Sequence, residues 1–109
     1  MSTDLTAALV AALGAEPTYS AKEAAALLER SYSWLDQGLR ENRFTLLDGT
    51  PIEPQRTAGG YRRFSLAILQ DIAMCCYRNG WFSMPKLKSV YTNLLKVAYR
   101  DTGRAEIPR

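Results

Sequence analysis

The stretch Gln55–Phe64 constrains the fold more than any other part of the chain, because two glycines stand directly before an aromatic–basic–basic–aromatic run. Gly59 and Gly60 allow the positive φ values that a tight turn into a strand often needs. The four residues after them alternate between the two faces of that strand, so one face can pack on a core while the other presents guanidinium groups. The stretch predicts a basic hairpin, or wing, attached to a helical body, and we expect Tyr61 and Phe64 to anchor it.

The basic residues are concentrated in the second half of the chain. Residues 1–53 carry four Lys or Arg and eight Asp or Glu, a net charge of −4, whereas residues 54–109 carry ten and three, a net charge of +7. Ten of the fourteen basic residues are Arg, which suits bidentate contacts with phosphate and guanine. An isoelectric point near 9.0 also fits an ordinary solvated basic surface, but the asymmetry favours a polyanionic partner.

Composition limits the possible classes of function. A chain of 109 residues that is 47% hydrophobic predicts one domain with a modest core. The chain has no His, which is the usual base of a catalytic triad and the commonest metal ligand. Its two cysteines are the adjacent pair Cys75–Cys76, and we expect them to be small core residues in a reducing cytoplasm. Because the carboxylates are also scattered, we expect a protein that is not an enzyme and that needs no metal and no cofactor.

The first residues of the chain are apolar without resembling a membrane anchor. No apolar run reaches the ~20 residues of a membrane span. The stretch Ala7–Leu13 follows Asp4 and precedes no cleavage site, so we expect no signal peptide and a soluble, cytoplasmic protein without a membrane partner. Leu5–Leu13 is expected to form a short helix, either a loose terminal element or a docking element for a neighbouring subunit.

Two capped helices follow in quick succession. The capping box Ser20–Glu23 begins a helix predicted over Ala21–Glu29. Ser31 caps a second helix that runs from Tyr32 to about Glu41, and Asn42 is a plausible left-handed stop. The short connection is typical of a helix-turn-helix, although many non-binding domains contain one as well.

The second helix should bury Leu35, Gly38 and Leu39. Trp34 lies one turn before Gly38, so its ring could cover the space that a larger residue at position 38 would need. Trp34 could instead stack on a sugar or wedge into DNA, but large aromatic side chains mostly serve cores, and we expect packing.

The wing is predicted to be long. Phe44–Leu47 indicates a strand, Asp48–Gly49 is a hairpin-type turn signal, and Thr50–Pro54, with two prolines, should be extended. The chain then returns through the basic hairpin, with Arg56 and Thr57 close to the tip.

Two more helices complete the prediction. Ser65 should cap a helix that ends at Asn79–Gly80, and Ser83 should cap a last helix over Met84–Tyr99. Their expected core residues are Leu66, Ile68, Leu69, Ile72, Ala73 and Cys76, then Met84, Leu87, Val90, Tyr91, Leu94, Leu95 and Ala98. The predicted organisation is an N-terminal helical extension (1–18), one domain (19–99) and a flexible tail (100–109).

The order of these elements resembles the DNA-binding domain of MerR-like winged-helix proteins. The similarity is carried by Tyr19–Leu28, Ser31–Phe44, Thr57–Ser65 and Leu69–Met84, and its most specific piece is the run of seven residues from Gly59 to Ser65. It implies a fold that is mainly α with a small β-hairpin wing, a winged helix-turn-helix.

MerR-like activators continue into a long dimerisation helix and an effector domain, whereas this chain stops soon after Tyr99. It looks more like the small phage excisionases, also called recombination directionality factors. That resemblance implies a protein that binds adjacent sites on double-stranded DNA, contacts other copies of itself head to tail, and bends the DNA. A phage integrase is then steered towards excision, and the protein would act on DNA in the cytoplasm of a bacterial host cell.

In such an arrangement the Tyr32–Arg40 helix enters the major groove. Ser33 and Gln37 are the candidates for hydrogen bonds to base edges, Arg40 for guanine or phosphate, and Tyr32 for the sugar–phosphate backbone. Asp36 either accepts a hydrogen bond from cytosine or orients Arg40.

The wing supplies the remaining candidate DNA contacts. Arg56 and Thr57 would reach the neighbouring minor groove or its phosphates, and Arg62 and Arg63 would clamp the backbone. Each Arg could instead be a solvated charge or pair with Glu41, Asp48 or Glu53, and the strand could turn Arg62 toward the body.

Two other functions stay open from the sequence. A short MerR-like transcriptional repressor without an effector domain would use the same groove chemistry, and a protein-interaction adaptor could keep the fold without binding DNA. An inverted repeat in the binding site would favour a dimeric repressor, whereas tandem direct repeats would favour a head-to-tail filament.

Overall fold

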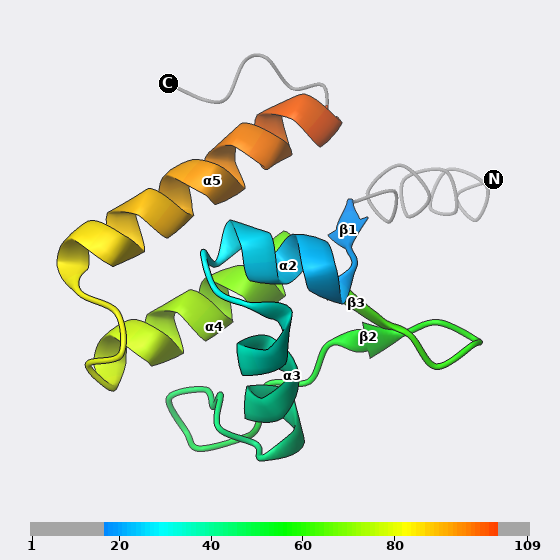
Figure 1. Ribbon diagram of the computed structural model, residues 1–109, viewed down its shortest axis with the longest axis horizontal. Helices are drawn as coiled ribbons and strands as arrows, with labels where there is room; N and C mark the ends of the chain where they lie inside the picture. Colours follow the sequence, from blue (N-terminus) through cyan, green and yellow to red (C-terminus); the bar gives the residue numbers. More distant parts are fainter. Residues whose placement is uncertain (1–16, 103–109) are drawn as a thin grey trace, which may run out of the picture.

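The computed structural model describes residues 17–102, which form a mainly helical body with a small three-stranded antiparallel sheet (Figure 1). The predicted helix over Leu5–Leu13 and the last seven residues lie outside the described part of the chain. The elements are β1 (Thr18–Tyr19), α2 (Ala21–Leu27), α3 (Tyr32–Arg40), β2 (Gln55–Arg56), β3 (Arg62–Ser65), α4 (Leu66–Arg78) and α5 (Met84–Thr102).

Serine caps set where the helices begin. The hydroxyls of Ser20, Ser31, Ser65 and Ser83 each accept a hydrogen bond from the backbone amide three residues later, at 3.1–3.2 Å. The amide of Ser20 also donates to the Glu23 carboxylate, which completes the predicted capping box. All four predicted helix starts are therefore confirmed.

The helix ends differ from the prediction by one to three residues. The helix α2 stops at Leu27 and Glu29 already has a left-handed backbone with φ 60°, while α3 stops at Arg40. Asn42 has φ 52°, so the predicted left-handed stop is confirmed. The helix α5 is longer than predicted and extends to Thr102.

The sheet is organised around β3, which pairs with β1 on one side and β2 on the other. Phe64 faces Tyr19 across the first pair, and Arg56 faces Arg62 across the second. The hairpin is therefore confirmed, although its return strand begins at Arg62 rather than Tyr61. Strand β1, which the sequence did not predict, attaches the hairpin to the start of α2 (Figure 1).

Tyr61 does not anchor the hairpin, which corrects the prediction. Phe64 is fully buried, but Tyr61 is 76% exposed, because it lies in the turn before β3. Tyr61 and Phe64 are three residues apart, so alternation places them on opposite faces, and Arg62 instead shares the inner face with Phe64.

The predicted strand over Phe44–Leu47 is absent from the described structure. Residues 44–52 hold a single isolated bridge between Thr45 and Pro51, closed by a turn in which Gly49 has φ 88°. The amides of Leu46 and Ile52 donate to the carbonyls of Thr50 and Phe44 on either side of this bridge, so the missing amide hydrogen of Pro51 costs no bond there. The pairing does not continue outward, because Asn42 has a left-handed backbone and Pro54 has no amide hydrogen to donate. The connection from α3 to the hairpin is instead a loop whose Phe44 and Ile52 are buried and whose Leu46 and Leu47 are exposed.

The core lies between the helix pair α2–α3 and the helix pair α4–α5, with α2 contacting both α3 and α5. It contains Phe44, Phe64 and Phe82 and both cysteines, which confirms the cysteines as core residues. The exposed side chains of Leu95 (60%) and Met84 correct their predicted place in that core. No helix among residues 17–102 is long and apolar enough to cross a membrane.

Trp34 packs against Phe44 and Phe82, with ring centroids 5.2 and 6.2 Å apart, so the packing interpretation is confirmed. Its predicted relation to Gly38 is wrong, however. A Cβ at position 38 would lie 2.5 Å from the ring of Phe44, so Phe44 occupies the space beside this glycine.

Candidate nucleic-acid interface

The outward face of α3 carries the two residues expected to read bases. Leu35 and Gly38 are buried on the inner side, whereas Ser33 and Gln37 are exposed. The Gln37 side-chain amide donates to Glu41 at 3.0 Å. At 100° per residue, Tyr32, Asp36 and Arg40 lie on one flank of Ser33 and Gln37, and Trp34 lies on the other.

A hollow of about 620 Å³ lies along the first flank, between α3, the start of α2 and the hairpin. We call it the wing hollow; it is lined by Ser20, Ala21, Lys22, Tyr32, Asp36, Arg40, Arg56, Thr57, Gly60, Tyr61, Arg62 and Arg63. Six of the eight predicted DNA-binding residues are therefore together, and Ser33 and Gln37 lie outside the lining. Among these described residues five side chains are cationic and one is a carboxylate.

Asp36 joins α3 to the hairpin. Its carboxylate accepts from Arg62 Nη1 at 2.7 Å and pairs with Arg40 Nε at 3.0 Å. The hydrogen bond from Arg62, assisted by the charge of Arg40, lowers the pKa of the Asp36 carboxyl. Arg62 is only 15% exposed and points toward the body, whereas Arg40 is 73% exposed.

The other hairpin residues also hold the structure together. Arg63 donates to the carbonyl of Thr18 at 2.8 Å and to its hydroxyl at 3.1 Å, which ties the hairpin to β1. Arg56 donates to the carbonyl of Gly60 at 2.9 Å, and the Thr57 hydroxyl accepts from the amide of Tyr61 at 3.1 Å. Arg56 stays exposed, so its remaining donors face solvent.

A second, smaller hollow of about 400 Å³ lies on the other flank of α3. It is lined by Arg30, Trp34, Arg43 and Trp81, and we call it the tryptophan hollow. The guanidinium carbon of Arg30 lies 5.2 Å from the centre of the Trp34 ring, a cation–π distance. Basic and aromatic side chains therefore border both sides of the outward face of α3.

Sequence reasoning considered Trp34 as a DNA contact but favoured packing. It missed the other members of this surface, which are Lys22, Tyr61, Arg30, Arg43 and Trp81. Lys22 belongs to the first turn of α2, and only the pairing of β1 with β3 brings it beside the hairpin. Arg30 and Trp81 are 51 positions apart, and each adjoins a recognisable signal, the Ser31 cap and the turn at Gly80. No local pattern predicts that they meet.

Metal binding has no visible basis in the described residues. Between residues 17 and 102, no group of three or more His, Cys, Asp or Glu side chains could hold a metal ion.

One comparison with known proteins gave a result. Residues 9–97 match the model of a family described as Domain of unknown function (DUF7229). Neither the curated proteins nor the solved structures yielded a match. The matched segment covers all three strands, all four described helices except the last five residues of α5, and both hollows. The chain therefore belongs to the family described as Domain of unknown function (DUF7229).

Proposed function

We propose that this protein binds double-stranded DNA in a sequence-specific way, as a winged helix-turn-helix with α3 as the reading helix and the β2–β3 hairpin as the wing. One observation carries the proposal. Side chains from α2, α3 and the hairpin converge in a strongly cationic hollow beside the exposed Ser33 and Gln37. A polyanion with features that a helix can read fits this combination.

In this proposal α3 enters the major groove, which is ~12 Å wide and admits one α-helix. Ser33 and Gln37 would face base edges, and Gln37 would exchange its bond with Glu41 for one to a base. Arg40, whose guanidinium is mostly exposed although paired with Asp36, can reach guanine or phosphate.

The two hollows correspond to the two phosphate strands that border a major groove. The wing hollow would take one strand through Lys22 and Arg56, with Tyr32 and Thr57 beside them. The tryptophan hollow would take the other strand through Arg30, with aromatic surface for the sugars. Arg62 and Arg63, which are bonded within the protein, contribute positive charge and hold the wing in place.

The biological role we propose is that of an excisionase, or recombination directionality factor. A single winged module covers only about 600–1,000 Å² of protein surface, so useful affinity requires copies on adjacent sites. Bending a short duplex costs ~1–6 kcal/mol, which several subunits can share. An integrase and further copies of this chain are the partners that this role requires.

The test of DNA binding is a mobility-shift titration on random-sequence and target duplexes at several salt concentrations. Replacing Arg56 or Lys22 with Ala should each reduce the slope of log K against log salt by about 0.9, the value for one lost phosphate contact. Lys96→Ala is the matched control, because Lys96 lies in a separate groove between α2 and α5. Absence of any shift at low salt would overturn the proposal and favour an adaptor.

Footprinting on the DNA that flanks the gene, combined with a circular-permutation assay, distinguishes the two DNA-binding roles. Tandem direct repeats with bent DNA are expected for an excisionase. A single inverted repeat bound without bending would instead identify an operator-binding repressor.

A further inference from the structure

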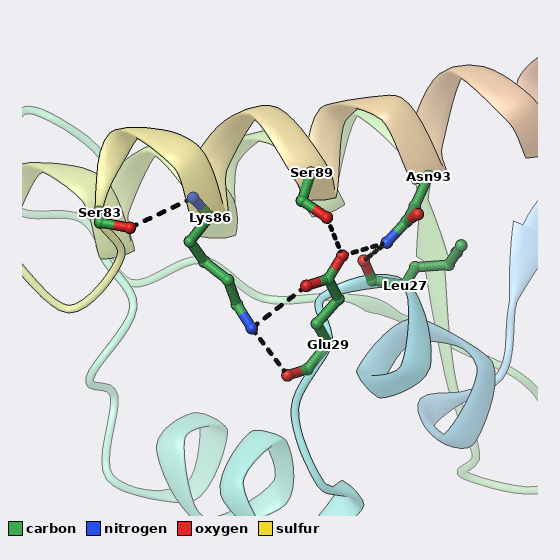
Figure 2. A network of polar contacts seen from close by, with 6 residues as sticks. All are labelled: Leu27, Glu29, Ser83, Lys86, Ser89 and Asn93. Carbon is green, nitrogen blue, oxygen red and sulfur yellow. Dashed lines mark hydrogen bonds and ion pairs between the residues drawn. The ribbon is translucent and has the colours of Figure 1, made fainter.

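The turn between α2 and α3 is held by α5, although about 60 residues of sequence separate them (Figure 2). The Glu29 carboxylate accepts hydrogen bonds from Ser89 Oγ and from Asn93 Nδ2, the latter at 2.9 Å, and pairs with Lys86 Nζ at 3.4 Å. We call these four residues the Glu29 network. The Ser89 bond, with help from Asn93 and Lys86, lowers the pKa of the Glu29 carboxyl.

The same α5 side chains satisfy backbone carbonyls at the end of α2. Lys86 Nζ donates to the Glu29 carbonyl at 3.1 Å, and Asn93 Nδ2 donates to the Leu27 carbonyl at 3.0 Å. The last carbonyls of a helix lack intrahelical partners, so donors from a neighbouring helix fix where and how α2 ends. Figure 2 shows both donors reaching from α5 to the turn.

The backbone at Glu29 has a conformation that is unusual for a residue with a side chain. Its φ of 60° lies in the left-handed region, where a side chain is strained and glycine is not. Glycine would therefore suit this turn better on backbone grounds alone. A strained non-glycine residue whose carboxylate makes three contacts to another helix points to a positioning role.

The network also touches the support of α3. Glu29 lies two residues before Ser31, the cap of α3. Lys86 Nζ lies 5.7 Å from the ring centre of Phe82, and that ring stacks on Trp34 in the first turns of α3. The network therefore contacts both the entry to α3 and the aromatic side chains that pack against it.

We propose that Glu29 is a positioning residue through which α5 sets the orientation of α3. The expected effect on DNA affinity rests on the proposed function, whereas the expected effect on the turn does not. In this arrangement α5 is a third support of the reading helix, beside α2 and the hairpin.

The test compares Glu29→Gly with Asn42→Gly. Both remove the strain of a left-handed non-glycine residue, at φ 60° and φ 52°, but only the first removes the network. The amides of Arg30 and Leu35 are the probes, because the first donates across the turn and the second donates at the start of α3. In the Glu29→Gly variant both amides should exchange hydrogen at least about tenfold faster, since the charge-assisted bonds that hold the turn are lost. Exchange of the Thr57 amide in the hairpin should not change, and Asn42→Gly should leave all three rates as they are.

Asn93→Ala removes two bonds from the α5 side, those to the Glu29 carboxylate and the Leu27 carbonyl, and leaves the turn sequence intact. It should also accelerate exchange at Arg30 and Leu35, and both variants should bind target DNA more weakly at a temperature where each is fully folded. Unchanged exchange in both variants overturns the inference. If the wild-type protein binds no DNA, the proposed function fails while the exchange measurement still decides whether α5 positions the turn.

Discussion

Asp36 places a negative charge within a proposed interface that is otherwise cationic. It is the one carboxylate among the described side chains that line the wing hollow, and a DNA phosphate would be repelled by it. Its two partners, Arg40 on α3 and Arg62 on β3, explain why an acid belongs there. One carboxylate holds two guanidinium groups from different elements. It therefore lowers the attraction for phosphate but fixes the orientation of both arginine side chains.

Replacing Asp36 with Asn should therefore increase non-specific DNA binding and decrease discrimination. The neutral amide removes the repulsion and releases Arg40 and Arg62, so affinity for random duplexes rises and its salt slope steepens by up to about 0.9 per phosphate gained. The ratio of specific to non-specific affinity falls, because the freed arginines no longer have one orientation. Competition mobility shifts measure both quantities, and an unchanged ratio would mean that Asp36 has no part in specificity. Glu53→Gln, an exposed site outside both hollows, is the control.

At the scale of elements, β1 connects parts of the protein that are distant in sequence. Its Tyr19 pairs with Phe64 in β3, and the Tyr19 hydroxyl donates to Asp101 near the end of α5 at 2.9 Å. Burial, and next the hydrogen bond to Asp101, raises the pKa of Tyr19 to about 12 from an ordinary 10.0. Two residues of β1 thus join the hairpin to the last described turns of the chain.

This pKa makes the contribution of Tyr19 dependent on alkaline pH. Because the folded-state pKa lies above the unfolded one, the stabilisation is fully present below pH 10 and is lost as pH rises from 10 through 12. Tyr19→Phe should lower the free energy of unfolding by about 1 kcal/mol at pH 8, the value of one hydrogen bond. The difference between variant and wild type should shrink at pH 11. Denaturant unfolding at pH 8 and pH 11 measures the difference in free energy of unfolding between variant and wild type. An equal difference at both pH values would contradict the expectation.

For the molecule as a whole, the two cysteines report on the common core. Cys75 and Cys76 are fully buried in α4 between the helix pairs, and burial together with the neighbouring Cys75 raises the pKa of the Cys76 thiol to about 12. A thiol reagent can reach this pair only when the core opens, and it reacts with the thiolate form. Thiol reactivity therefore reports the opening of the whole domain.

Labelling of the native protein at pH 8 should be at least about a thousandfold slower than labelling in denaturant, as expected for a domain stabilised by about 5–15 kcal/mol. Mass spectrometry after timed reaction gives the rate. Fast labelling of the native protein would show that α4 opens locally. The cysteines of the Glu29→Gly variant should be labelled no faster than those of the Asn42→Gly variant, if the effect of the Glu29 substitution is confined to the turn.

Local chemistry in the sequence was enough to predict the helix starts, the left-handed stop at Asn42 and the glycine turn before β3. A cap or a tight turn involves residues three or four positions apart, so the pattern contains all the participants. The same reasoning failed at Phe44–Leu47, because the pairing with Pro51 cannot continue past the left-handed Asn42 and the amide-free Pro54. It also did not anticipate β1, whose two residues are stable only when paired with β3.

The sequence by itself determined the polar and basic side chains that we propose as DNA contacts, and six of the eight residues share one hollow. Only the tertiary structure decided what each does there. Arg62 turns to Asp36 and Arg63 turns to Thr18, because alternation along β3 leaves one facing the body and the other facing β1. Lys22 joins the surface through strand pairing, and Glu29 is held from α5. Such contacts span 26 to 64 positions of sequence, so their geometry depends on how whole elements pack.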